Sequence, residues 1–207
     1  MTITERKFLD DVYDLKDAEA TQALYRDWAE TYDAELITAG YVGPRRCAVA
    51  LAEFADDKAA PVLDVGCGTG LSGEALKQAG FTCVDGTDFS DEMLKTAGCK
   101  GIYRKVFKGD LNNPLPGAPG DYAHIAAVGV FSPGHAPCEL IDAALGKLEA
   151  GGCFVFTLND HALSDRSYEG RLREVIDAGM AELAFKEHGD HVPGAGLCST
   201  VYVLRKR

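Results

Sequence analysis

Residues 62 to 70 read Val-Leu-Asp-Val-Gly-Cys-Gly-Thr-Gly, and this stretch decides the fold. The short run Val62–Val65, with two β-branched valines, enters a turn with three glycines, and apolar residues at helical spacing begin directly afterwards, at Leu71. The order predicts a strand, a tight turn and a helix, with backbone N–H groups presented at the helix N-terminus. Glycine is needed in such a turn because a Cβ would keep a ligand away from the main chain.

The acidic residue inside the predicted strand argues against a phosphate ligand. Asp64 lies two residues before Gly66, where a carboxylate would repel a pyrophosphate but would suit a cationic ammonium or sulfonium. No Gly-Lys-Ser/Thr follows the turn, which excludes the loop of nucleotide hydrolases. A dinucleotide-binding turn stays open, because Gly68-x-Gly70-x-x-Gly73 has its spacing, although Gly68 falls well past the strand end.

Two more predicted strands end in acidic residues. A strand over residues 82–88 ends in Asp88, roughly 20 residues beyond the turn, where a carboxylate can accept both hydroxyls of a ribose. A strand over residues 102–108 leads to Asp110, which can accept from an adenine amino group, and to Leu111, which can pack on the ring. Acids at three successive strand ends are the pattern of a protein that binds S-adenosylmethionine.

These motifs resemble those of the class I S-adenosylmethionine-dependent methyltransferases. Residues 62–70, Gly86-Thr-Asp-Phe-Ser-x-Glu-Met-Leu94 and Gly109-Asp-Leu111 match the successive cofactor motifs of that family. Tyr25-x-x-Trp28-Ala29-x-x-Tyr32-Asp33 and Phe131-Ser-Pro-Gly-His135 are similar to the Williams–Beuren-region methyltransferase-like group. The resemblance implies S-adenosyl-L-methionine as the cofactor, with Cys67 as a small packing residue rather than a nucleophile. The cofactor-binding residues that we expect are Tyr25, Tyr32, Asp64, Gly66, Cys67, Gly68, Asp88, Phe89, Met93, Asp110, Leu111 and Val128.

The remaining pattern predicts an α/β protein with a doubly wound, Rossmann-like, seven-stranded sheet and an antiparallel last strand. We expect an N-terminal helical cap over residues 1–58 and an S-adenosylmethionine-binding methyltransferase domain over 59–207. The hairpin across residues 189–196 makes the last strand antiparallel. The expected strands are 62–65, 82–88, 102–108, 122–130, 153–158, 182–187 and 197–204, and the expected helices include 21–36, one ending near 54, 138–148 and 168–178.

Charge narrows the class of methyl acceptor. The chain has 32 Asp and Glu against 21 Lys and Arg, a formal net charge of −11 that opposes a polyanion. No Asn/Asp-Pro-Pro-Tyr segment follows the fourth predicted strand, and the basic Arg205-Lys206-Arg207 is best explained as a solvated tail. We therefore expect a small-molecule acceptor and no nucleic-acid partner.

Location and metal content are also constrained by composition. No apolar run approaches the roughly 18 residues of a membrane span, and the N-terminus lacks a hydrophobic signal region, so we expect a cytoplasmic protein without a membrane partner. Seven cysteines without a Cys-x-x-Cys pair indicate neither a zinc site nor a disulfide framework. We expect no metal.

Among the histidines, His135 is the candidate general base. It follows the fourth predicted strand, near the edge where such sheets bind ligands, and its ordinary pKa suits proton transfer. A role in capping the following helix is equally open. We expect His188 and His191 to be exposed in the hairpin loop rather than to form a metal pair, His124 to be a satisfied core residue, and His161, beside Asp160, to serve a loop or a helix cap.

Some alternatives stay open at this stage. The aromatic stripe of Trp28 and Tyr32 suits either the core or a lid over the site. A non-catalytic S-adenosylmethionine binder would carry the same cofactor motifs. An NAD(P)-dependent oxidoreductase is less favoured, because Tyr103 and Tyr122 lack the lysine four residues on that such enzymes use. The oligomeric state and the identity of the acceptor are not fixed by the sequence.

Overall fold

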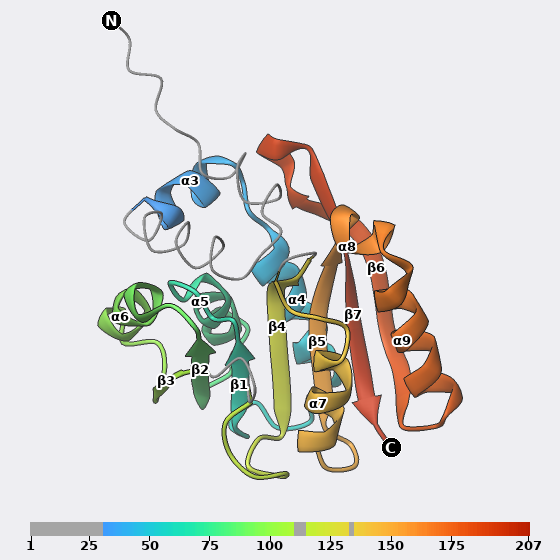
Figure 1. Ribbon diagram of the computed structural model, residues 1–207. Coiled ribbons are helices and arrows are strands. Elements are labelled where there is room, and N and C mark those ends of the chain that lie inside the picture. Colours follow the sequence, from blue (N-terminus) through green and yellow to red (C-terminus); the bar gives the residue numbers. More distant parts are fainter. Residues whose placement is uncertain (1–30, 110–114, 133–134) are drawn as a thin grey trace, which may run out of the picture.

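A seven-stranded sheet organises the protein (Figure 1), whose computed structural model describes residues 31–109, 115–132 and 135–207. The strand order is β3-β2-β1-β4-β5-β7-β6. The strands are β1 (Val62–Val65), β2 (Val84–Asp88), β3 (Val106–Lys108), β4 (His124–Phe131), β5 (Cys153–Asn159), β6 (Ala181–Val192) and β7 (Leu197–Lys206).

Strand direction changes only at β7. The pairs β1–β2, β1–β4, β2–β3 and β4–β5 are parallel, whereas β7 runs antiparallel to both β5 and β6. Every residue of β1 and β5 is buried, as expected for strands that are covered on both faces. The prediction of a doubly wound, seven-stranded sheet with an antiparallel last strand is confirmed. The parallel pairing of Val65 with Thr87 brings the carboxyl ends of β1 and β2 together.

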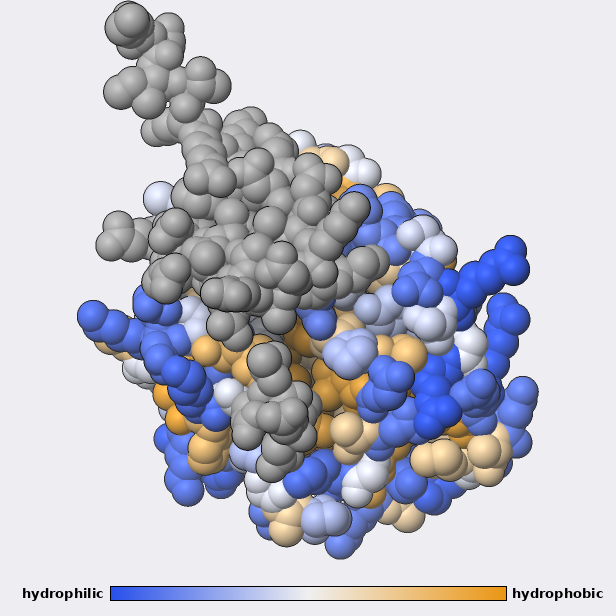
Figure 2. Space-filling model, viewed as in Figure 1, coloured by the Kyte–Doolittle hydropathy of each residue, from blue (hydrophilic) through white to orange (hydrophobic). Residues whose placement is uncertain are grey.

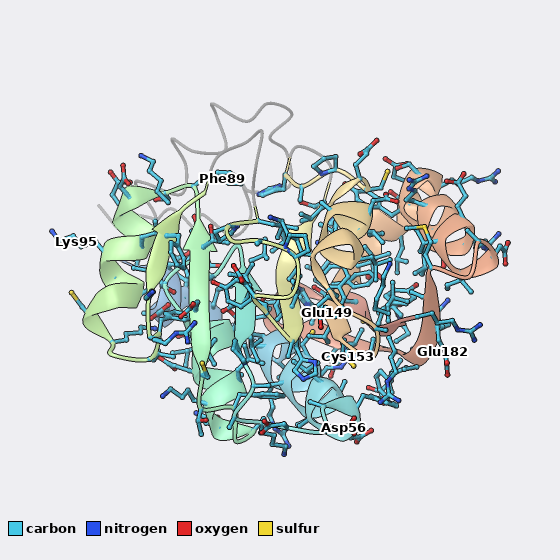
Figure 3. The ribbon with its side chains drawn as sticks, turned by 90° about the horizontal axis from the view of Figure 1, so that it is seen from below. Asp56, Phe89, Lys95, Glu149, Cys153 and Glu182 are labelled. Carbon is cyan, nitrogen blue, oxygen red and sulfur yellow. The ribbon has the colours of Figure 1, made fainter. Side chains whose placement is uncertain are left out.

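Helices form a layer on each face of the sheet. Leu51 of α4 (Gly43–Phe54) and Leu76 of α5 (Leu71–Gln78) share one apolar cluster with Val155. Leu145 of α7 (Leu140–Lys147) and Leu172 of α9 (Arg166–Asp177) belong to a second apolar cluster, which includes Phe156 of β5. Seen from below, with Asp56 marking the end of α4, these two pairs of helices lie on opposite sides of the sheet (Figure 3). The other helices of the described residues are α3 (Tyr32–Thr38), α6 (Asp91–Cys99), α8 (Asp160–Ser164) and the short η1 (Pro193–Ala195).

Aromatic rings fill the core beneath α7 and α9. Phe156 stacks on Phe154 and Tyr202, with centroid distances of 4.7 and 5.2 Å, and Phe131 meets the edge of Phe156 at 5.4 Å. All four side chains are at most 1% exposed.

On the face shown in Figure 2, hydrophobic residues gather in the middle, within an outer rim that is mostly hydrophilic.

Two predicted strands differ by several residues from the observed ones. The third strand begins at Val106 rather than at residue 102. The preceding Tyr103 donates through its hydroxyl to the buried Asp64, and the exposed Arg104 donates to Asp85. Strand β6 continues to Val192 through Gly189 and Asp190, which we expected in a loop, so the turn shrinks to residues 193–196. Helix α8 was not predicted.

Only part of the predicted N-terminal cap can be compared with the structure. Tyr25 and Trp28 lie outside the described residues, while α3 begins at Tyr32 and buries Leu36. Helix α4, which the predicted boundary at residue 58 assigns to the cap, packs into the core with the sheet. The division into cap and domain stays a prediction. None of the helices in the described parts of the chain has the length and apolar character that a bilayer crossing needs.

Candidate active site

The glycine turn lies at the carboxyl end of β1. Gly66, Gly68 and Gly70 have φ values of 64°, 53° and 103°, which lie in the left-handed region that glycine tolerates. A Cβ on Gly66 would stand 2.6 Å from Val130 Cγ2, whereas a Cβ on Gly68 would meet no atom of the described residues within 4 Å. Within the described part of the chain, the main chain at Gly68 can therefore be approached closely by a ligand.

A pocket opens over this turn. It brings together five of the expected cofactor residues, Tyr32 from α3, Gly66, Cys67 and Gly68 from the turn, and Val128 from β4. Tyr41 was not predicted to line the pocket. A Cβ on Gly129 would lie 2.7 Å from the Tyr41 hydroxyl oxygen, so the glycine makes room for this side chain. The full lining is Tyr32, Tyr41, Pro44, Gly66, Cys67, Gly68, Thr69, Leu71, Ser72 and Val128.

Asp64 lies fully buried beneath the turn. Its Oδ2 accepts from the Ser72 hydroxyl at 2.6 Å and from the Tyr103 hydroxyl at 2.7 Å. Its Oδ1 is buried and has no hydrogen-bond donor among the described residues. Burial raises the pKa of Asp64 to about 6, against the effect of the two hydroxyl donors. A buried carboxylate with an unused oxygen fits a cationic ligand.

Asp88 connects the glycine turn to α6. Its Oδ2 accepts from the N–H of Gly68 and its Oδ1 from the N–H of Ser90, each at 2.9 Å. Ser90, rather than Asp88, is the N-cap of α6 and accepts from the N–H of Met93 at 3.2 Å. Burial raises the pKa of Asp88. Each carboxylate oxygen keeps a further lone pair, so both can still accept from hydroxyl groups.

The residues expected around the adenine are only partly described. Phe89 lies against Gly109 at the end of β3, because a Cβ on Gly109 would be 3.2 Å from the Phe89 ring. Met93 is 1% exposed and belongs to the packed face of α6. Asp110 and Leu111, like Tyr25, lie outside the described residues. Cys67 is buried, and burial raises the pKa of its thiol, which agrees with packing rather than nucleophilic chemistry.

His135 follows the carboxyl end of β4. Its Nδ1 lies 2.7 Å from the buried Ser132 hydroxyl, and the loop is held by a hydrogen bond from the N–H of Ala136 to the carbonyl of Val130. If Nδ1 donates to Ser132, Nε2 is the basic nitrogen. The N-cap of α7 is Glu139, so the alternative prediction that His135 caps this helix is wrong.

The other histidines are structural. His124 is buried and its Nδ1 accepts from the N–H of Cys153 at 3.2 Å, as predicted for a satisfied core residue. The prediction for His191 is wrong: it lies in β6, is 2% exposed and packs edge-on against Tyr41. His188 is exposed, but on the strand, where its Nδ1 lies 3.1 Å from the Thr200 hydroxyl.

His161 lies in α8, whose N-cap is Asn159. All seven cysteines are free thiols. Within residues 31–109, 115–132 and 135–207, no three His, Cys, Asp or Glu side chains lie together as metal ligands would.

Comparison with known proteins identifies the kind of domain that contains the glycine turn. A model of the methyltransferase domain matches residues 62–152, which include the glycine turn and strands β1 to β4. Human (Homo sapiens) methyltransferase-like protein 27 is 33% identical over 165 residues, 76% of this chain and 66% of that protein. The 18S rRNA (guanine-N(7))-methyltransferase of Bos taurus is 42% identical over 67 residues, 32% of this chain and 24% of that protein. The chain thus aligns with just under two thirds of the first relative and about a quarter of the second.

The fold has many solved counterparts. Magnesium protoporphyrin IX methyltransferase from Synechocystis PCC 6803, solved with bound S-adenosylhomocysteine, superimposes with a TM-score of 0.61 at 18% identity, over 80% of this chain and 84% of that one. The chain belongs to the class I S-adenosylmethionine-dependent methyltransferases. S-Adenosylmethionine is the cofactor of this family.

Proposed function

We propose that the protein transfers the methyl group of S-adenosylmethionine to a small-molecule acceptor. The observation that carries this proposal is the buried Oδ1 of Asp64, which has no hydrogen-bond donor among the described residues, next to a glycine turn where no described residue would crowd a Cβ on Gly68. A nucleotide phosphate would be repelled there, whereas the ammonium group of a methionine moiety would be attracted. The residues present therefore fit the cofactor of the family.

Each expected residue has a proposed part in holding the cofactor. Asp64 and the main chain at Gly66, Cys67 and Gly68 hold the methionine end, and Asp88 accepts from the ribose hydroxyls. The remaining residues enclose the adenosine or cover the pocket: Tyr25, Tyr32, Phe89, Met93, Asp110, Leu111 and Val128.

Methyl transfer from a sulfonium needs little general acid–base catalysis from the protein. When bound, S-adenosylmethionine supplies a methyl group on a sulfonium, which is a good leaving group. The protein must align the acceptor in line with that methyl and exclude water, and such positioning supplies most of the acceleration. We assign to His135 the removal of a proton from the acceptor, with Ser132 fixing its ring at Nδ1.

The acceptor class rests on charge. A formal net charge of −11 gives a field that opposes RNA, which is the substrate named for the Bos taurus relative. That relative aligns with only 32% of this chain, so its substrate does not carry over. A small neutral or cationic molecule would meet no such electrostatic barrier.

The oxidoreductase alternative loses support on one further point. Tyr202 does have a lysine four residues on, Lys206, which would be the spacing of a proton donor in such enzymes. Both residues lie in β7, and Tyr202 is buried within the core. Tyr202 therefore belongs to the core, where its hydroxyl does not serve as the proton donor of a hydride transfer.

The test uses S-adenosylmethionine with a labelled methyl group. The purified protein is incubated with separated small-molecule, RNA and protein fractions of a cell extract, and label is followed into each. We expect label in the small-molecule fraction. Label in RNA or protein alone would overturn the acceptor class. Binding of S-adenosylhomocysteine without transfer to any fraction would favour the non-catalytic binder.

A further inference from the structure

Tyr103 reaches beneath the glycine turn from the segment between α6 and β3. Its hydroxyl and that of Ser72 both donate to Oδ2 of Asp64, at 2.7 and 2.6 Å. The two donors converge on one oxygen of a fully buried carboxylate, and the other oxygen accepts no hydrogen bond from the part of the chain that the structure describes. This asymmetry orients the carboxylate.

Two glycines make room for the phenol ring. A Cβ on Gly73 would lie 2.4 Å from the Tyr103 hydroxyl oxygen, and a Cβ on Gly86 would lie 3.1 Å from Tyr103 Cε1. In a dinucleotide-binding turn the third glycine allows close packing of helix on strand. Here Gly73 has the spacing of that third glycine, but it leaves room for the Tyr103 hydroxyl to reach Asp64. The spacing Gly68-x-Gly70-x-x-Gly73 is therefore explained by the packing of Tyr103 rather than by dinucleotide binding.

We propose that Tyr103 is a positioning residue that, together with Ser72, directs Oδ1 of Asp64 toward the α-ammonium group of S-adenosylmethionine and so sets the pH range in which the cofactor binds. The proposal rests on the proposed function, because it assumes that this pocket holds the methionine end of the cofactor.

The pH dependence follows from the charge of Asp64, which must be ionised to attract a cation. Burial raises its pKa to about 6, and the donors Ser72 and Tyr103 oppose that rise because they stabilise the carboxylate. Affinity should therefore fall as the pH drops through about 6. Without the Tyr103 hydroxyl, the pKa of Asp64 rises further, and the fall moves to higher pH.

Other titratable groups also face Asp64. They are the thiols of Cys47 on α4 and Cys67 in the turn, the Tyr103 phenol, and the carboxyl of Asp88 on β2. Burial raises the pKa of both thiols and of the phenol, so these three stay protonated at neutral and acidic pH. Burial also raises the pKa of Asp88, so the test must separate the effect of its protonation from that of Asp64.

Two ligands achieve that separation in titration calorimetry between about pH 5.5 and 8. S-Adenosylhomocysteine carries the amino acid end, whereas 5′-methylthioadenosine lacks it but keeps the ribose. Protonation of Asp88 should therefore change the affinity for both ligands, and protonation of Asp64 only the affinity for S-adenosylhomocysteine. For Tyr103→Phe, we expect the fall in S-adenosylhomocysteine affinity to move upward by roughly one pH unit, which follows from losing one hydrogen bond to a charged group. Near pH 6 the affinity should be several-fold weaker than that of the wild type, with methylthioadenosine unaffected.

Tyr122→Phe is the matched control. The Tyr122 hydroxyl donates to Asp85 Oδ2 at 3.0 Å, at the opposite end of β2, so its loss should leave both profiles as in the wild type. A folded Tyr103→Phe protein with the wild-type profile would overturn the proposal. If that variant does not fold, Ser72→Ala removes the other donor and must give the upward shift. A wild type that binds neither ligand would instead overturn the proposed function.

Discussion

Lys100 and Asp33 form an ion pair, with 2.6 Å between Nζ and Oδ2, that joins the C-terminal end of α6 to α3. The same ammonium lies 3.0 Å from Glu74 on α5, and the other oxygen of Asp33 accepts from the Thr69 hydroxyl in the glycine turn. Asp33 directly follows Tyr32, which lines the pocket. The polar contacts therefore fix the position of that aromatic ring relative to the turn.

Breaking this ion pair should weaken cofactor binding without abolishing it. Its side chains are only 20% and 30% exposed, so we expect an effect above the 0–1 kcal/mol that is typical of a fully exposed pair. This corresponds to a loss of S-adenosylhomocysteine affinity on the order of tenfold in Lys100→Met. The control is Lys108→Met, which breaks the exposed pair with Asp91. Equal affinities of the two variants in titration calorimetry would refute a role for Asp33 and Lys100 at the pocket.

Ligand preference is the broadest prediction. S-Adenosylhomocysteine at one hundred times its dissociation constant should stabilise the protein by about 2.7 kcal/mol. For a chain of this size that corresponds to a rise in melting temperature of roughly 5–10 °C. NAD and NADP should give no rise in a thermal-shift panel. A response to NAD alone would contradict the whole functional assignment.

Asp88→Ala should lose both affinity and stability. The carboxylate is proposed to accept from two ribose hydroxyls, and hydrogen bonds to a charged group contribute roughly 1.5–3 kcal/mol, so cofactor affinity should fall tenfold or more. The N–H groups of Gly68 and Ser90 would also lose their acceptor, which lowers the melting temperature. Asp88→Asn should be milder, because its side-chain oxygen still accepts.

The 2′-deoxy analogue of the cofactor tests directly whether Asp88 contacts the ribose hydroxyls. Wild-type protein should bind it more weakly than the parent compound, whereas Asp88→Ala should distinguish the two much less. Asp91→Ala is the control, since Asp91 begins the same helix and forms an exposed ion pair with Lys108. Unchanged affinity with a lowered melting temperature would show that Asp88 serves the fold alone.

His135→Ala should lower kcat by roughly a hundredfold or more, with KM little changed, if this imidazole removes the acceptor proton. Ser132→Ala should cause a smaller loss, since it only orients the ring. His188→Ala is the matched control, because His188 is exposed on β6. Initial rates are measured with the acceptor found in the labelling experiment. A wild-type kcat in His135→Ala would leave in-line alignment as the sole source of acceleration.

His191 should make the protein sensitive to acid. Burial, and then the charge of Arg46, lower its pKa from 6.5 to about 4, so the unfolded chain binds the proton more readily. Stability is therefore lost as the pH falls from about 6.5 toward 4, by up to about 3 kcal/mol. Urea unfolding over this range should show a flatter pH dependence for His191→Gln. Parallel curves for variant and wild type would contradict the assignment.

The part of the site that consists of one continuous segment, the glycine turn, could be predicted from local motifs. Residues 62–70 contain the strand, the turn and the start of the helix, so their order alone predicted the backbone geometry at Gly66 and Gly68. Tyr103 and Tyr41 were missed because their contacts depend on tertiary packing. Neither lies in a motif, and each uses space left by a distant glycine.

His191 was misassigned for a related reason. Gly189 and Asp190 are residues typical of turns, yet they pair across the hairpin with Ser199 and Cys198 in an extended strand. Arg46 of α4 supports this strand by donating to the carbonyl of Asp190 at 2.8 Å. Tertiary contacts thus override the local turn preference and carry His191 into the interior.

The double hydrogen bonding of Asp88 has a kinetic consequence. Because protein groups alone hold Gly68 and Ser90 on one carboxylate, the turn loses its conformational entropy during folding rather than during binding. The cofactor then encounters a rigid platform, and its association rate should not depend on any slow ordering of the loop. Analogues that differ at the ribose should accordingly share similar association rates and differ in how long they stay bound.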